Sequence, residues 1–222
     1  MTSEPPAPPA PGGAGAAKPA PAKPAAKAEA KAPPAPPLPP DPPPPDDQPR
    51  PDWLAALEST LPGAVSQLVF FVGDWTLVTT SDRLLDLLRW LRDAEGARFD
   101  FLSDLTATDW PARAERFDVV YCLYSVPRRD RVRVKVRVAD GGHVPSVTAL
   151  WPAANWFERE VFDMFGVRFA GHPDLRRILM PDQWEGHPQR KDYPLEGPGE
   201  LLLENPVDWL KVRQQTTGAD FE

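Results

Sequence analysis

The sequence contains few of the residues from which redox centres are built. Its 222 residues include a single cysteine, Cys122, whereas an iron–sulfur cluster is normally held by four thiolates. No Gly-x-Gly-x-x-Gly motif follows a predicted strand, so neither a nicotinamide nor a flavin site is visible. We therefore expect no cofactor in this chain. We also expect Cys122, which lies in an apolar stretch, to be a buried structural thiol.

Long apolar runs are also missing. No stretch approaches the roughly 20 apolar residues that a membrane-spanning helix needs, so any membrane association must come through partners. The formal net charge of −7 lies entirely in residues 51–222, because the cations and carboxylates before them cancel. An acidic body argues against nucleic acid as a partner.

The first 50 residues differ from the rest in composition. They hold 19 of the 31 prolines and 13 alanines, and they contain no aromatic residue. Because such a segment lacks the apolar surface to offset its ordering entropy, we predict a disordered arm over residues 1–50, partly in the polyproline II conformation. The arm has no apolar run typical of a secretory signal, and no arginine before Arg50 suggests a mitochondrial presequence. We favour a solubilising spacer over a ligand for an SH3-like partner.

Residues 51–166 are predicted to form an α+β domain, with a mostly antiparallel sheet of about five strands packed by three helices. The predicted strands are residues 67–72, 75–80, 98–107, 116–126 and 131–138. The predicted helices are residues 52–61, a leucine-rich segment capped by Ser81 or Asp82 and ended by Gly96, and residues 152–166. Gly73-Asp74 suits a type II′ turn between the first two strands. Strand 116–126 is apolar on both faces, which favours an interior position.

Strand 131–138 alternates strictly between valine and cation. Its valines are expected to face the core, with the cations on the other face: Arg131, Arg133, Lys135 and Arg137. We favour a solvated strand face whose charges also discourage edge-to-edge pairing. The alternative is a basic stripe that meets an acidic patch of a neighbouring subunit.

The predicted helix 152–166 has an unusually wide apolar surface. At 100° per residue its apolar side chains cover about two-thirds of the circumference. Only three polar residues share the remaining strip: Asn155, Arg159 and Asp163. Glu158 and Glu160 project from sides that this pattern assigns to the interior, and a buried carboxylate needs a partner. We therefore expect the following segment to fold back and pair through its cations: Arg168, Arg176, Arg177, Arg190 and Lys191.

Residues 156–195 resemble the signature of one known family. The motifs are Glu158-Arg159-Glu160, Asp163-Met164-Phe165-Gly166, Gly171-His172-Pro173-Asp174-Leu175-Arg176-Arg177-Ile178-Leu179, Trp184-Glu185-Gly186-His187-Pro188 and Arg190-Lys191-Asp192-Tyr193-Pro194. Together they resemble the 30-kDa subunit of respiratory complex I, which is also found in the bacterial NADH-quinone oxidoreductases. The match is looser over residues 53–155, and Gln189 stands where the family pattern leads us to expect leucine.

The resemblance implies a peripheral subunit without a catalytic centre of its own. The holoenzyme passes electrons from NADH through FMN and iron–sulfur clusters, held by partner subunits, to quinone and couples this to proton translocation. The expected neighbours are the 49-kDa-type subunit and the subunit that carries the last cluster, on the cytoplasmic face of a bacterial inner membrane. The expected subunit-interface residues are Glu158, Arg159, Glu160, Asp163, Gly166, His172, Asp174, Arg176, Arg177, His187, Arg190, Lys191, Asp192 and Tyr193.

Residues 167–222 are predicted to form an extended interaction tail. They combine six prolines with scattered large apolar side chains, which is too irregular for a second core and too apolar for a free arm. We therefore expect this tail to depend on a partner for its order.

Two other interpretations compete with the resemblance. A metal-dependent hydrolase would use Glu160, Asp163, His172 and His187. Against it, Glu158 and Glu160 lie about 160° apart on the helix, and each histidine precedes a proline that holds it extended. A binding module that acts outside any respiratory complex is excluded only by the resemblance itself.

Overall fold

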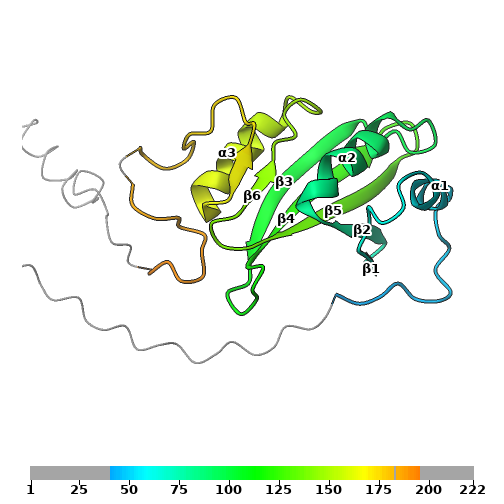
Figure 1. Cartoon of the computed structure of the whole chain (residues 1–222), viewed down its shortest axis with the longest axis horizontal. Coiled ribbons are helices and arrows are strands. Elements are labelled where there is room, and N and C mark those ends of the chain that lie inside the picture. The colour runs from blue at the N-terminus through cyan, green and yellow to red at the C-terminus, as the bar shows by residue number, and fades with distance from the viewer. Residues whose placement is uncertain (1–40, 183, 196–222) are drawn as a thin grey trace, which may run out of the picture. The chain divides into compact units, whose positions relative to one another are not determined.

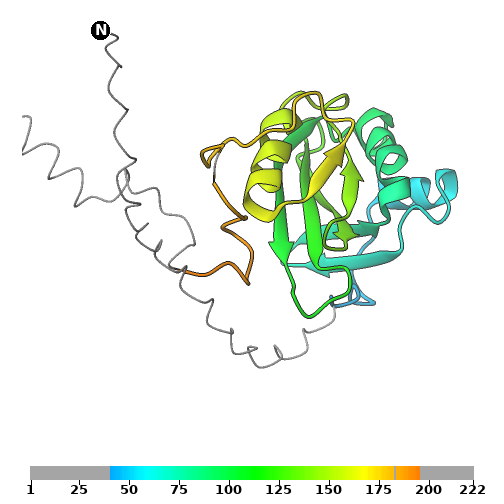
Figure 2. The same ribbon diagram turned by 60° about the vertical axis from the view of Figure 1, so that its left-hand side comes forward.

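The helices of this chain pack against one face of a five-stranded sheet (Figures 1 and 2). The computed structural model describes residues 41–182 and 184–195. Most of the predicted arm and residues 196–222 of the predicted tail lie outside the described residues. The predicted α+β class, with a mostly antiparallel sheet and three α-helices, is confirmed.

The strands follow the order β1-β2-β5-β4-β3 across the sheet. Their bounds are β1 (Gln67–Phe71), β2 (Asp74–Thr79), β3 (Phe101–Asp109), β4 (Phe117–Ser125) and β5 (Asp130–Val138). All neighbours pair antiparallel except β2 and β5, which run parallel. β4 lies between β5 and β3, so its predicted interior position is confirmed. A separate parallel pair is formed by β6 (His143–Pro145) and β7 (Arg168–Ala170).

The helices α1 (Asp52–Thr60), α2 (Leu84–Asp93) and α3 (Ala154–Phe165) share one core with the sheet. α2 faces it with the predicted apolar stripe, which is fully buried: Leu84, Leu87, Leu88 and Leu91. Figure 1 places α3 on the β3 side and α1 on the β1 side. The core therefore spans the full width of the sheet.

The predicted ends of α2 are wrong. A 3₁₀ turn, η1 (Ser81–Arg83), precedes the helix, and no side chain caps its first turn through a hydrogen bond. The helix stops at Asp93, three residues before Gly96. Here the 3₁₀ turn leads the backbone into the helix, so the capping pattern in the sequence has no role.

The predicted β1–β2 turn is shifted by one residue. Phe71 pairs with Asp74, so the loop consists of Val72 and Gly73. Both have positive φ, 52° and 85°, as a type I′ turn requires. The sequence favours a type II′ turn because a valine with positive φ is uncommon.

The alternation of β5 is confirmed, but its predicted edge role is wrong. The valines are buried, and β5 is the middle strand of the sheet, so its cations do not protect an edge. Three of them pair with carboxylates of this chain: Arg133 with Asp74, Lys135 with Asp41 and Asp118, and Arg137 with Asp41. These pairs lie on the face that the helices leave uncovered, which we call the open face.

Cys122 also lies on the open face and is half-buried, so the prediction of a buried thiol is met only in part. Its cross-strand neighbours are Asp104 on β3 and Arg133 on β5. Burial and the charge of Asp104 raise the pKa of the thiol. Because β4 is an interior strand, apolar residues occupy both its faces, and the sequence could not show which face Cys122 takes.

Candidate functional site

The residues with the most distinctive pattern come together where α3 meets the segment that follows it. α3 ends at Phe165, close to the predicted boundary, and Gly166 reverses the chain with a φ of 78°. We call the described residues after this point, 167–182 and 184–195, the strap. In Figure 1 the strap leaves the end of α3 and passes beside that helix, in yellow to orange.

Asp163 anchors the strap to α3. Its side chain is 0% exposed, and one carboxylate oxygen accepts a 2.6 Å hydrogen bond from the Arg177 guanidinium. The other oxygen accepts from three successive backbone N–H groups, those of Ile178, Leu179 and Met180, at 3.1, 2.8 and 2.8 Å. Burial raises the pKa of this carboxyl, but the Met180 N–H and the other donors together lower it more, so the net pKa is depressed. Asp163 is therefore a charged, fully coordinated anchor.

Two arginines complete this anchor, Arg177 from the strap and Arg159 from α3. Arg177 also donates to the carbonyls of Trp184 and Gly186, both at 3.0 Å. Arg159, on α3, is buried and donates to the carbonyls of Arg176 and Arg177 at 3.1 and 2.9 Å. The guanidinium groups thus hold carbonyls in a segment that has no regular secondary structure.

The strap also caps the end of α3. A helix leaves its last four carbonyls without helical partners. Here the Gly166 N–H donates to the Phe162 carbonyl, and groups of the strap donate to the next three carbonyls. His187 Nδ1 binds the Asp163 carbonyl at 2.9 Å, the Gln189 N–H binds that of Met164 at 3.1 Å, and Arg190 Nε binds that of Phe165 at 2.6 Å. Gln189 acts here through its backbone, so the departure from the expected leucine leaves this contact intact.

Gly166 permits this close approach. A Cβ atom at this position would lie 2.6 Å from His187 Nε2 and 2.8 Å from the Arg190 guanidinium. Burial lowers the pKa of His187, which favours the neutral ring beside two arginines. The imidazole also packs edge-on against Phe162. The His187 ring therefore lies between the end of α3 and the Arg190 guanidinium, where a side chain at position 166 would collide with it.

A second ion network fixes the end of the strap to the sheet. Arg116 forms a bidentate pair with buried Asp109 at 2.7 and 2.8 Å, and a second pair with Asp192 at 2.8 and 3.0 Å. Asp109 also accepts the Lys191 N–H at 2.7 Å, and Arg190 pairs with Asp140 at 2.9 Å. Arg116 and Asp140 have no distinctive sequence pattern, so only the fold reveals that they belong to the site.

A buried cluster lies at the N-terminal half of α3. Glu158 is 0% exposed, and its carboxylate accepts the Val147 N–H at 2.7 Å. His172 Nδ1 accepts the Asp174 N–H, which leaves the proton on Nε2 to donate to the Asn155 carbonyl. That Nε2 lies 4.0 Å from Glu158. Burial raises the pKa of Glu158 to about 7. The prediction that Glu158 pairs with a cation of the following segment is wrong, because the arginine of that segment, Arg177, pairs with Asp163 instead.

The prediction that Glu160 is buried is wrong. Glu160 is exposed, and Trp156, one turn before it, is 59% exposed. The strap covers the polar strip of Arg159 and Asp163 instead, because these residues supply its hydrogen-bond partners. Other signature residues are also exposed: Asp174, Arg176, Lys191 and Asp192. Tyr193 is half-buried and packs against Gly186, where a Cβ would lie 2.8 Å from the ring.

The sequence also matches the family model of the respiratory-chain NADH dehydrogenase 30 Kd subunit over residues 77–199. The chain belongs to this 30 Kd subunit family. It is 45% identical over 181 residues to an NADH-quinone oxidoreductase subunit of Hyphomonas neptunium, covering 79% of this chain and 90% of that one. It is 46% identical over 180 residues to the corresponding subunit of Azorhizobium caulinodans, covering 79% and 85%.

A solved structure shows the same fold. A chain of the membrane-bound sulfane sulfur reductase, an archaeal respiratory membrane complex, superposes with a TM-score of 0.56 at 24% identity, covering 74% of this chain and 90% of that chain. At this identity the likeness concerns the fold alone. The matched 30 Kd family region begins in β2 and includes all of α3 and the strap.

The hydrolase interpretation is not supported in this member of the 30 Kd family. Glu160 faces solvent, while the oxygens of Asp163 are occupied by Arg177 and three N–H groups. His172 and His187 each bind a different backbone carbonyl. Among residues 41–182 and 184–195, no group of three or more His, Cys, Asp or Glu side chains is placed to hold a metal ion. In the same part of the chain, no helix has the length and apolarity needed to span a bilayer.

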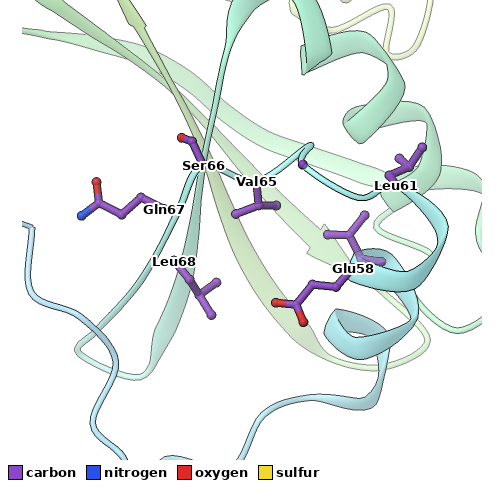
Figure 3. A pocket seen from close by; sticks show the side chains of 8 residues that line it. Glu58, Leu61, Val65, Ser66, Gln67 and Leu68 are labelled. Atoms are coloured by element: carbon purple, nitrogen blue, oxygen red, sulfur yellow. The ribbon is translucent and has the colours of Figure 1, made fainter.

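A small hollow between α1 and β1 contains none of the predicted site residues (Figure 3). Its volume is ≈ 150 Å³, and the residues that Figure 3 labels around it are Glu58, Leu61, Val65, Ser66, Gln67 and Leu68. Glu58, its one ionisable side chain, pairs loosely with Arg50 at 3.9 Å. A single exposed carboxylate offers no acid–base pair, so this hollow adds no chemistry.

Proposed function

We propose that this chain is a structural subunit of a proton-translocating NADH-quinone oxidoreductase, carrying no cofactor itself. It would hold together the quinone-reducing junction, beside the 49-kDa-type subunit and the subunit that carries the last cluster. FMN and the iron–sulfur clusters would lie in partner subunits. Membership of the 30 Kd family supports the complex, and the relatives named as NADH-quinone oxidoreductase subunits support the reaction.

One observation carries the structural role. The signature residues Arg159 and Asp163, which are buried, and Arg177, which is partly buried, direct their charged groups at each other or at strap backbone. A catalytic side chain must have a donor or acceptor atom free to contact a substrate. The charged atoms of these three residues already bind groups of the same chain. Their arrangement is therefore suited to shaping a rigid surface rather than to chemistry.

The outward residues of the same motifs supply the surface. Trp156 and Leu179 are 59% and 60% exposed, and exposed Glu160 lies one helical turn from Trp156. Large exposed apolar side chains rimmed by charges are typical of protein interfaces. We propose that this face binds a neighbouring subunit, and that the chain reaches the cytoplasmic face of the inner membrane only through such neighbours.

Charge reversal at Glu160 tests this proposal. Glu160→Lys should leave the thermal unfolding of the isolated subunit unchanged and should reduce the amount of subunit recovered with the membrane-bound complex. Glu95→Lys is the matched control, because Glu95 is also exposed but lies after α2 and not on α3 or the strap. Wild-type recovery of Glu160→Lys would show that this face is not the interface. Normal recovery with lost NADH-quinone turnover would assign Glu160 a chemical role and overturn the structural one.

A further inference from the structure

The open face of the sheet contains a larger hollow, with a volume of ≈ 610 Å³. All five strands or their ends contribute to it. Its lining combines apolar and charged side chains: Asp41, Pro42, Val69, Phe71, Thr76, Thr108, Trp110, Arg113, Asp118, Val120, Arg133 and Lys135. Phe71 in this lining is 60% exposed. The hollow lies on the opposite face of the sheet from the helices, and the family signature does not include it.

The first described residue of the chain already sits in this hollow. The Asp41 carboxylate pairs with Arg137 at 2.8 Å and with Lys135 at 3.3 Å, both on the middle strand β5. Its carbonyl accepts a 3.4 Å hydrogen bond from Gln67 on the edge strand β1. From here the chain continues past β1 to α1, as the blue segment of Figure 1 shows. The residues before Asp41 therefore start from the centre of the open face.

The register of the sheet sets what the preceding residues can reach. Opposite Lys135 lie Val120 on β4 and Thr106 on β3, and opposite Arg137 lie Asp118 and Thr108. From β5 to β3 is two strand spacings, about 10 Å. A polyproline II chain rises about 3.1 Å per residue, so about three residues cover this distance. Counting back from Asp41, the third residue is Leu38.

Leu38 is unlike the rest of the arm. It is the only leucine, isoleucine, valine or aromatic residue among residues 1–50, and prolines flank it in pairs, Pro36-Pro37 and Pro39-Pro40. Proline-rich segments bind aromatic-lined grooves because their polyproline II form loses little entropy on binding. At the β3 end of the hollow, the Trp110 indole donates to Thr108 at 2.9 Å and stacks under the Arg113 guanidinium. An apolar anchor and an aromatic wall thus occur at matching distances from Asp41.

We infer that residues 36–40 bind in this hollow in cis, with the Leu38 side chain between Val120 and Trp110. Asp41 fixes the start of the segment on β5, and the prolines direct it across β4 toward β3. This inference is independent of the proposed role in the oxidoreductase, because it concerns contacts within one chain.

Paramagnetic relaxation in the full-length isolated subunit tests the inference. A nitroxide is attached at Ala35→Cys in a Cys122→Ser background, and the indole N–H signal of Trp110, assigned by Trp110→Phe, is recorded by NMR. We expect this signal to lose most of its intensity relative to the reduced label. Adding Leu38→Asp should restore it, because a carboxylate replaces the apolar anchor. Adding Ala28→Asp, which places the same charge ten residues earlier, should not.

Two results would overturn the inference. The first is broadening of the Trp110 signal that is the same with and without Leu38→Asp, since a freely moving tether would produce it. The second is no broadening in the isolated subunit together with a shift of the Trp110 signal on assembly, which would assign the hollow to a partner's segment. Unchanged signals elsewhere in the sheet would confirm that each variant is folded.

Discussion

The two halves of α3 bury a carboxylate in opposite ways. Asp163, near the end of the helix, receives a guanidinium and three backbone N–H groups. Glu158, five residues earlier, receives one backbone N–H, and its second oxygen has no hydrogen-bond partner within the described residues. Both side chains are 0% exposed. Burial alone therefore does not decide whether a carboxylate stays charged; the number of donors does.

The stability contributions of Asp163 and Glu158 therefore depend on pH in opposite ways. The depressed pKa of Asp163 means that this group contributes stability above its ordinary pKa and loses it as the pH falls through the folded value. Glu158 behaves in the reverse sense. Its pKa rises from 4.5 to about 7, so its contribution becomes unfavourable as the pH rises between these values. Near neutral pH the Asp163 carboxylate is ionised and holds the strap, whereas the Glu158 carboxyl in the N-terminal half of α3 is close to its pKa.

The largest expected effect is from Asp163→Ala. The substitution leaves the Arg177 guanidinium and three N–H groups without their acceptor, so the free energy of unfolding should fall by about 3 to 5 kcal/mol. Urea unfolding of the isolated subunit measures this. Amide exchange should also become faster at residues 178–180. A loss below about 1 kcal/mol would mean that the strap is held from elsewhere.

Glu158→Gln should have the opposite effect and raise the free energy of unfolding. Between pH 4.5 and about 7 the Glu158 carboxyl ionises in the unfolded wild type but stays protonated in the folded one, and this difference favours unfolding. The amide of the variant cannot ionise in either state, so the variant lacks this cost. Its gain in unfolding free energy over the wild type should grow between pH 4.5 and 7 and level off at about 1 to 3 kcal/mol. Unfolding curves at pH 5 and pH 8 check this. A gain that is equal at both pH values would contradict the raised pKa.

Arg190→Met should have an intermediate effect. The methionine keeps an apolar stem over Phe117 but loses the donor to the Phe165 carbonyl and the pair with Asp140. We expect a loss of about 1 to 2 kcal/mol in unfolding free energy. Arg176→Met is the matched control, because its pair with Asp174 is exposed on both sides and should be worth less than about 0.5 kcal/mol. Equal losses of unfolding free energy in the two variants would show that capping of α3 by Arg190 does not stabilise the subunit.

The smallest expected effect is from Glu160→Ala. Since Glu160 is exposed, the unfolding free energy of the isolated subunit should change by less than about 0.5 kcal/mol. The same substitution would cost several times more if the helix had the rotation that its apolar pattern suggests. Thermal unfolding of Glu160→Ala and Asp163→Ala under identical conditions shows whether α3 is rotated with Glu160 outward or inward.

The strap shows a related difference between expectation and structure. Its irregular sequence predicts order only on a partner. The hydrogen bonds of residues 176–192 instead tie much of it to its own helix and sheet, so we expect its anchored amides to be protected in the isolated subunit. A role for its outer side in binding a neighbour stays a prediction. Charge pairs between distant residues leave no periodic trace in a sequence, which is why the pattern alone does not reveal them.

Periodicity did predict the elements that depend on local spacing. The leucine face of α2, the alternation of β5, the length of α3 and the mixed class of the fold all follow from which residues recur at a period of two or 3.6. The motifs in residues 156–195 predicted the family as well, because their density of specific residues is independent of geometry. These features depend on neighbours in the chain, and the sequence therefore determines them.

Only the tertiary structure decided which side of α3 is covered. An apolar pattern places Trp156 inside and Arg159 outside, but the strap offers carbonyls and N–H groups that only Arg159 and Asp163 can satisfy. Leaving those strap groups buried without partners would cost more than exposing one tryptophan. The rotation of the helix thus follows from hydrogen bonds to residues 14 to 18 positions away, and these become visible only when the chain has folded back on itself.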